Sequence, residues 1–343
     1  MRETSRDKLA SPSPLIRIES PQTFSASLRL LVANPNMKHL SLTGLVAATH
    51  TPFHADGSLN LNAVEAQAAH LAANGVSYAF IGGTTGESSS LALAERRALA
   101  VRWMEVTRGA KLKVIVHVGA NCLGDARDLA AQAQQLGAVA ISALAPSYFK
   151  PGNVARLVDC VADIAAAAPE LPFYYYEIPL LTGINLAPSE FLAQAADRIP
   201  NLAGIKFTSN NLMEYQLCRA FRGGAFDLPY GFDEIMLSAL ALGATGAVGS
   251  SFNFAAPIYL RLMKAFAAGD LKTAREEQFR SVQTIAVLAA RGYMGAAKAT
   301  MKMLGVDVGP ARLPNGSLSA EQQATLRAEL EKLGFFDWVK RPQ

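Results

Sequence analysis

The sequence has few cysteines, little charge and no long apolar run. Its three cysteines, Cys122, Cys160 and Cys218, are scattered over 343 residues. An odd, scattered set argues against a disulfide framework and favours reduced thiols, so we expect a cytoplasmic protein. No uncharged apolar run reaches the roughly 18 residues that cross a membrane, so we expect no membrane partner.

Charge is sparse and almost balanced. Charged residues make up 17% of the chain and the net charge is +4, whereas about a quarter of a typical domain is charged. Six basic and three acidic residues fall within the first forty positions, which leaves the rest nearly neutral. No basic face therefore indicates a nucleic-acid partner. Hydrophobic residues make up 50% of the chain, enough for a large core.

Residues 1–40 differ in composition from the rest. They are basic and rich in serine, and the Ser-Pro-Ser-Pro run at 11–14 prevents a continuous helix. A targeting peptide has this composition, but no apolar segment with a cleavage site is visible. We therefore expect a basic, disordered N-terminal tail, or translation that starts at Met37.

From residue 42 onward, apolar strand-like segments alternate with helix-like segments. The expected strands are 42–49, 77–81, 113–118, 139–144, 172–178, 201–208, 226–230 and 246–250. The expected helices are 61–73, 94–107, 125–136, 154–167, 189–196, 212–221, 234–242 and 256–267. Eight such pairs predict an α/β fold, a (β/α)₈ TIM barrel over 41–268. A doubly wound open sheet needs fewer units and usually a glycine-rich first turn.

Beyond the barrel, the sequence predicts three more helices. They cover 271–290, 295–304 and 320–333. We expect them to form a C-terminal helical appendage over 269–343.

Lys206 is a single cation inside an apolar strand. It stands between Ile205 and Phe207, in a run bounded by Pro200 and by polar residues from Ser209 onward. Desolvation disfavours a charged amine, and a neutral amine can attack a ketone to form a Schiff base. The alternative is a lysine at a strand end whose amine reaches water.

In a TIM barrel, chemistry gathers at the carboxyl ends of the strands. The second strand ends in Gly82-Gly83-Thr84-Thr85-Gly86-Glu87, where hydroxyls and amides can hold a carboxylate. This segment lacks the Gly-Lys-Ser/Thr ending of a P-loop, and a plain turn is the alternative.

Other polar groups follow the remaining strands. The fourth strand leads to Tyr148, and the seventh to Gly231 and the carboxylates Asp233 and Glu234, of which Asp233 could instead cap a helix. The eighth strand ends in Gly249-Ser250-Ser251. In the fifth strand, alternation puts Tyr174 and Tyr176 on one face and Tyr175 on the other.

Together these segments resemble the pyruvate-dependent class I aldolases, the superfamily of N-acetylneuraminate lyase and dihydrodipicolinate synthase. The matching segments are Gly83–Glu87, Tyr176 with Ile178-Pro179, Thr182-Gly183, Gly204–Lys206 and Gly243–Ser250. They occur in the family's order and spacing, and the resemblance covers residues 42 to about 335.

Three features resemble the N-acetylneuraminate lyase branch. They are the strand Phe173–Pro179, the segment Gly231–Glu234 and the C-terminal segment Gly309–Pro314. Glu177 departs from the usual His or Asn of that branch. Leu181 stands where the synthases usually have an arginine for the second substrate's carboxylate, a contact that an apolar side chain cannot make.

The resemblance implies retro-aldol cleavage of N-acetylneuraminate to pyruvate and N-acetylmannosamine. Lys206 would form the Schiff base, Tyr176 would move the proton, and Thr84 with the catalytic Thr85 would hold the carboxylate. Tyr148 would join a proton relay or complete a neighbouring subunit's site. The residues implied to bind the polyhydroxyl tail are Thr208, Gly231, Asp233, Glu234, Gly249 and Ser250.

The resemblance also implies a homotetramer that needs no metal or organic cofactor. The five histidines form no His-Glu-x-x-His site. His50 and His54 are four residues apart, but Pro52 lies between them and prevents the helix that would align them.

Two other functions remain open. The first is another aldolase or dehydratase of the superfamily, which would act on a 2-keto-3-deoxy sugar acid. Glu177 keeps this function open, because an added charge could change recognition of the substrate's tail. Dihydrodipicolinate synthase is the weaker variant of this alternative. A non-catalytic sugar-acid-binding protein would bind ligand without turnover, which the intact Lys206 and Tyr176 disfavour.

Overall fold

The computed structural model describes residues 40–340. The predicted tail, apart from Leu40, lies outside the described residues. None of the helices in the described part of the chain is both long enough and apolar enough to cross a membrane.

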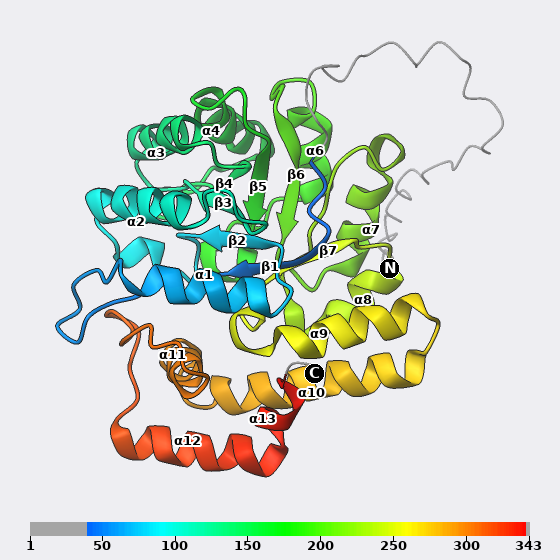
Figure 1. Cartoon of the computed structure of the whole chain (residues 1–343). Helices are drawn as coiled ribbons and strands as arrows, with labels where there is room; N and C mark the ends of the chain where they lie inside the picture. Colours follow the sequence, from blue (N-terminus) through cyan, green and yellow to red (C-terminus); the bar gives the residue numbers. More distant parts are fainter. Residues whose placement is uncertain (1–39, 341–343) are drawn as a thin grey trace, which may run out of the picture. The chain divides into compact units, whose positions relative to one another are not determined.

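Parallel strands form the centre of the fold (Figure 1). They are β1 (Gly44–Ala48), β2 (Tyr78–Ile81), β3 (Lys113–His117), β4 (Ala140–Ala143), β5 (Phe173–Glu177), β6 (Leu202–Phe207) and β7 (Gly246–Gly249). Hydrogen bonds connect them in the order β6-β5-β4-β3-β2-β1-β7. Residues 227–230 bridge β6 and β7, through Gly204↔Asp227, Phe207↔Tyr230 and Tyr230↔Ala247. The predicted barrel is confirmed.

The prediction of a strand at 226–230 is wrong, because this segment forms isolated bridges but no regular strand. Pro229 accepts a hydrogen bond from the Phe207 amide at 3.0 Å. It has no N–H to donate in return, so the ladder is interrupted at this residue. The segment still closes the barrel, since Tyr230 donates to Gly246 and accepts from Val248.

The predicted helices are all present with small shifts of their ends. Around the barrel they are α1 (Ala63–Ala73), α2 (Leu93–Val106), α3 (Leu123–Leu136), α4 (Val154–Ala166), α6 (Pro188–Ala195), α7 (Leu212–Ala220), α8 (Met236–Ala241) and α9 (Phe252–Ala267). The predicted helix 234–242 begins as a separate 3₁₀ turn, η4 (Asp233–Ile235). Four short elements were not predicted: α5 (Pro179–Thr182), η2 (Ser88–Ser90), η3 (Phe221–Gly223) and α13 (Phe335–Trp338).

Buried side chains form two layers, one inside the barrel and one between the strands and the helices. Alternation along β5 assigns its tyrosines to these layers as predicted. Tyr174 and Tyr176 belong to the inner layer with Phe80 and Val248. Tyr175 faces outward, and its ring centroid lies 4.5 Å from that of Phe191 in α6.

The C-terminal helices lie on one side of the barrel (Figure 1). They are α10 (Leu271–Ala289), α11 (Tyr293–Met303), α12 (Ala320–Leu333) and the short α13 (Phe335–Trp338). The helices α10, α11 and α13 contact α9, and α12 packs against α10 and α11. The helix α11 also reaches the barrel loops, since the Lys298 amine donates to the Thr51 carbonyl at 2.9 Å. The helix α11 therefore contributes side chains to the same end of the barrel as the predicted site.

Candidate active site

Lys206 and Tyr176 are paired residues on neighbouring strands. Each is the last but one residue of its strand, at the carboxyl end of the barrel, and the β5–β6 register aligns them. The Lys206 Nζ lies 3.5 Å from the centroid of the Tyr176 ring and 4.5 Å from that of Phe80. Both side chains point into the barrel, so the strand pairing places an amine against a phenol.

Burial makes the Lys206 amine unusually acidic. The residue is only 4% exposed. Desolvation lowers its pKa to about 7, although the negative charge of Asp233 opposes this shift. Within residues 40–340, Lys206 forms no ion pair. A large fraction of the amine is therefore uncharged at neutral pH and can act as a nucleophile.

The Tyr176 hydroxyl links Lys206 to the loop after β2. It lies 3.1 Å from the Thr84 Oγ1, and either group can donate the hydrogen bond. Burial raises the pKa of Tyr176 to about 12, an effect that the Thr84 hydrogen bond reduces. The phenol is therefore protonated at neutral pH and can relay a proton through Thr84. Thr85, the next residue, is buried as well.

His117 is a neighbour of Tyr176 that the sequence analysis missed. It ends β3, and its ring meets that of Tyr176 edge-on with centroids 5.8 Å apart. Its Nδ1 lies 2.9 Å from the Gly82 carbonyl. Burial, with the charges of Arg96 and Lys206, holds its pKa well below the usual value, so the ring is neutral. The sequence analysis could have found His117, because it lies at the carboxyl end of a predicted strand, as the other site residues do.

Glu177, the departure from the family pattern, lies on the opposite face of β5 from Tyr176. Its carboxylate accepts a hydrogen bond from the Thr208 amide at 3.1 Å. Burial raises its pKa to about 7, and Glu214 in α7 adds to this effect, while the Thr208 amide opposes it. Glu177 therefore orients the residue two positions after Lys206 rather than pointing into the barrel.

Thr208 and Gly231 are brought together as predicted, but Gly231 has a steric explanation. A Cβ at Gly231 would lie 2.0 Å from the Thr208 Oγ1. Within the described residues this buried hydroxyl makes no hydrogen bond of regular geometry, although it lies close enough to the Tyr176 hydroxyl to lower the pKa of that group. A buried polar group usually has a partner, so Thr208 has a hydroxyl available for a ligand.

Asp233 is held by the first turn of α9. Its Oδ2 accepts from the Ser251 amide at 2.8 Å and also from the Ser251 hydroxyl. The alternative prediction, that Asp233 caps the helix that follows it, is wrong, because it forms no cap there. A Cβ at Gly249 would lie 2.7 Å from the Asp233 Oδ2, so Gly249 makes room for the carboxylate.

Glu234 and Ser250 are half-buried neighbours of Asp233 and Ser251 in the chain. Burial and the charge of Asp233 raise the pKa of Glu234 to about 7. The Ser250 Oγ lies 2.7 Å from the hydroxyl of Tyr293. Tyr293 begins α11 and was missed, because no sequence pattern indicates which appended helix reaches the barrel mouth.

Tyr148 is the one predicted site residue that lies apart from the buried cluster. It is 78% exposed, and its ring packs edge-on against that of Phe149. Its backbone amide donates to Asn121 Oδ1 at 3.0 Å. Its predicted role in a proton relay or a neighbouring subunit's site therefore remains a prediction.

These contacts define a class of site: a lysine-centred site at the carboxyl end of a parallel barrel. The amine of Lys206 can act as a nucleophile, and the hydroxyls of Tyr176 and Thr84 can move a proton. Carboxylates and hydroxyls follow the neighbouring strands at the same end of the barrel. Such a set suits a carbonyl compound with a polyhydroxyl tail.

Comparison with known proteins places the chain in a family. The model of the dihydrodipicolinate synthetase family matches residues 41–333. This chain belongs to that family.

Three relatives illustrate the similarity. N-acetylneuraminate lyase A of Xenopus laevis is 40% identical over 296 residues, which are 85% of this chain and 97% of the relative. The structure of the N-acetylneuraminate lyase of Aliivibrio salmonicida is 42% identical, with a TM-score of 0.84 and coverage of 86% and 98%. The DHDPS of Cyanidioschyzon merolae is 31% identical, with a TM-score of 0.79 and coverage of 85% and 98%.

Proposed function

We propose that this protein is an N-acetylneuraminate lyase, which cleaves N-acetylneuraminate to N-acetylmannosamine and pyruvate. The observation that carries the proposal is the buried Lys206 amine, 3.5 Å from the Tyr176 ring centroid, with its pKa lowered to about 7. The relatives named N-acetylneuraminate lyase, at about 40% identity over most of the chain, support the choice of substrate.

The first step is formation of the Schiff base. The lone pair of the Lys206 amine attacks the C2 ketone of the open-chain acid, and water leaves to give an iminium. Thr84 and Thr85 hold the adjacent carboxylate. The iminium then accepts the electron pair of the C3–C4 bond, so no metal or organic cofactor is needed for bond cleavage.

The second step transfers a proton. As the C3–C4 bond breaks, the Tyr176 oxygen takes the proton of the C4 hydroxyl and gives its own phenolic proton to Thr84, which passes one on to the substrate carboxylate. C4 then leaves as the aldehyde of N-acetylmannosamine. The proton returns to C3 of the enamine, and water then hydrolyses the iminium to pyruvate and free Lys206. The hydrogen bond between Tyr176 and Thr84 supports this relay.

The tail of the substrate would lie against the polar group around Asp233. In the described part of the chain, the buried Thr208 hydroxyl makes no hydrogen bond of regular geometry. Glu234 has a pKa of about 7, so its carboxyl can donate or accept. The remaining predicted contacts are Gly231, Gly249 and Ser250. Leu181, which replaces the arginine of the synthases, supports the lyase over dihydrodipicolinate synthase.

We also propose that the protein is a cytoplasmic homotetramer. The segments after two neighbouring strands, β4 and β5, expose large apolar side chains, and such surfaces mark contacts between subunits. These side chains are Tyr148, Phe149, Leu180 and Leu181. Light scattering after size exclusion tests the assembly, and fractionation tests the location.

Pyruvate release from N-acetylneuraminate by the purified protein tests the proposed function. We expect release that is unaffected by a metal chelator. Much faster cleavage of 2-keto-3-deoxygluconate would favour the other sugar-acid aldolases. Ligand binding without turnover, and without a Lys206 adduct after borohydride treatment with pyruvate, would favour a binding protein.

A further inference from the structure

Glu87 has a backbone conformation that is unusual for its residue type. Its φ is +53°, in the left-handed region that favours glycine, and the residue is 4% exposed. A non-glycine residue in this region is strained and persists only when the surroundings hold it there. Glu87 directly follows the Thr84-Thr85-Gly86 segment, so this conformation belongs to the loop that contacts Tyr176.

The conformation of Glu87 closes the loop that carries the threonines. The Glu87 amide donates to the Thr84 carbonyl at 2.9 Å, and the Ser88 amide donates to that of Gly83 at 3.2 Å. The Thr51 hydroxyl donates to the Gly86 carbonyl at 2.6 Å. A shift of Glu87 would therefore move the Thr84 hydroxyl relative to Tyr176.

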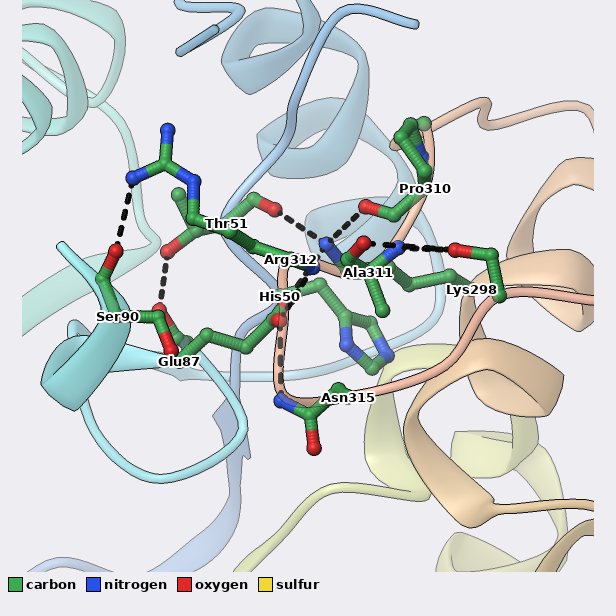
Figure 2. A network of polar contacts seen from close by, with 12 residues as sticks. His50, Thr51, Glu87, Ser90, Lys298, Pro310, Ala311, Arg312 and Asn315 are labelled. Carbon is green, nitrogen blue, oxygen red and sulfur yellow. Dashed lines mark hydrogen bonds and ion pairs between the residues drawn. The ribbon is translucent and has the colours of Figure 1, made fainter. Parts of the chain in front are cut away.

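The Glu87 carboxylate is held by the C-terminal part of the chain (Figure 2). Its Oε1 lies 2.6 Å from the Lys298 Nζ, and both side chains are buried. Its Oε2 accepts from the Arg312 amide at 2.8 Å and from the Asn315 Nδ2 at 3.1 Å. These donors come from α11 and the segment after it, more than 200 residues away in the chain.

The Lys298 amine has further contacts at this position. Besides its ion pair with Glu87, its amine donates to the carbonyls of Thr51 at 2.9 Å and Pro310 at 2.8 Å (Figure 2). Burial and the charge of Lys298 lower the pKa of His50 to about 3, so that ring adds no positive charge. The ion pair is therefore charge-balanced by its two members.

The segment that supplies the other two donors is also fixed in place. The Arg312 guanidinium pairs with both oxygens of Glu95, at 2.7 and 2.8 Å. It also donates to the carbonyls of Gly57 and Ser90, at 2.6 and 2.9 Å. The contacts of Arg312 therefore anchor the segment that supplies the two donors to Glu87.

We propose that the buried Glu87–Lys298 pair is a positioning device, through which the C-terminal helices set the Thr84–Thr85 loop for the carboxylate of the 2-keto acid. Neither residue touches the substrate in this scheme; both act through the loop. The inference rests on the proposed function, because it assigns the carboxylate to this loop. It predicts that the appended helices control the affinity for the keto acid.

A double variant tests the proposal without leaving a buried unpaired charge. Glu87→Gln with Lys298→Met removes both charges, and losing a whole pair is tolerated better than losing one partner. The readout is borohydride trapping of pyruvate on the full-length protein, measured over a range of pyruvate concentrations. Pyruvate carries the carboxylate but no sugar tail, so it reports on this loop.

The matched control removes another buried carboxylate and its partner. Glu277 in α10 is buried and pairs with Arg261 of α9 at 2.8 Å and with Arg280 of α10 at 2.6 Å. No ion pair or hydrogen bond connects it to the Thr84–Thr85 loop or to Lys298 in the described residues. The control is therefore Glu277→Gln with Arg261→Met. Chemical unfolding of both double variants gives the loss of stability against which trapping is compared.

We expect the half-saturating pyruvate concentration of the Glu87–Lys298 variant to rise about tenfold or more, with the maximal trapping rate within about threefold of the original. The control should keep the original value even where its stability falls as much. An unchanged half-saturating concentration in the Glu87–Lys298 variant would overturn the inference. No trapping by the original protein would instead overturn the proposed function, and this inference with it.

A milder variant covers the case in which the double variant does not fold. Asn315→Ala removes one hydrogen bond to Glu87 from a half-buried side chain. We expect the half-saturating pyruvate concentration to rise about threefold. An unchanged value in this folded variant would contradict the positioning role.

Discussion

Two lysines are buried in the described part of the chain, and their surroundings are opposite. Lys206 lies against the rings of Tyr176 and Phe80 and has no ion pair there. Lys298 pairs with Glu87 and donates to two carbonyls. Burial lowers the pKa of both amines, but only Lys298 has a carboxylate in contact to oppose this.

The comparison shows that burial alone does not make a nucleophile. A buried ammonium that keeps a carboxylate partner is stabilised as a cation and serves to hold segments together. A buried amine against aromatic rings loses hydration without full compensation, so its neutral form becomes accessible. The difference lies in the partners, which come from distant parts of the chain.

Replacing Lys206 should have the largest effect on activity, because it removes the nucleophile and leaves the Glu87–Lys298 pair intact. In Lys206→Met we expect pyruvate release and borohydride trapping to fall to the uncatalysed background, because the amine proposed to form the Schiff base is gone. The free energy of unfolding should stay the same or increase, since a desolvated amine is removed from an apolar site. A variant that retained trapping would assign the nucleophile elsewhere.

Tyr176→Phe tests the role of the Tyr176 hydroxyl in proton transfer. The ring that contacts Lys206 remains, but the hydroxyl that bonds Thr84 is lost. We expect kcat for cleavage to fall by about 10²–10⁴-fold, the usual range for a general acid–base group. Trapping of pyruvate should survive, because it needs no cleavage. Steady-state kinetics with nearly normal kcat would show that Tyr176 does not transfer the proton.

Lys298→Met should affect stability where Lys206→Met does not. Its loss leaves the Glu87 carboxylate buried without its cation, which costs about 3–5 kcal/mol. Urea unfolding of the two lysine variants side by side measures the contrast. Equal stability of both variants would remove the distinction between a paired and an unpaired lysine.

The pH dependence of borohydride trapping tests the protonation state of the Lys206 amine. Its pKa is lowered from 10.5 to about 7, so the amine is protonated below that pH and neutral above it. We expect the trapping rate at low pyruvate to fall about tenfold for each pH unit below 7 and to level off above it. A rate that kept rising to pH 10 would mean that the amine has an ordinary pKa.

Glu177→Gln should have the smallest effect. The carboxylate faces the Thr208 amide on the opposite side of β5 from Tyr176, and an amide oxygen can accept the same hydrogen bond. We expect kcat/KM for N-acetylneuraminate to stay within about threefold. A change of preference toward 2-keto-3-deoxygluconate would instead show that Glu177 selects the substrate.

The sequence predicted the barrel well because its signals are local. Alternation of apolar strands and helices, and caps such as Gly137 after α3, depend on neighbouring residues only. The strand at 226–230 was mispredicted because Pro229 breaks the ladder there. Lys206 and Tyr176 could be found because both lie at strand ends.

The parts of the site that were not predicted depend on long-range packing. Tyr293 reaches Ser250 and Lys298 reaches Glu87 only because α11 packs beside the barrel. No local pattern in 293–298 indicates either contact. The positive φ of Glu87 likewise follows from its partners, since glutamate has no intrinsic preference for that region.

The most direct test of the account is to locate the pyruvate adduct. The protein is treated with pyruvate and borohydride, digested, and mapped by mass spectrometry, with Lys206→Met and Lys298→Met alongside. We predict one modified site, at Lys206, in the original protein and in Lys298→Met, and none in Lys206→Met. An adduct at Lys298, or no adduct in the original protein, would contradict the claim that an unpaired buried lysine is the nucleophile.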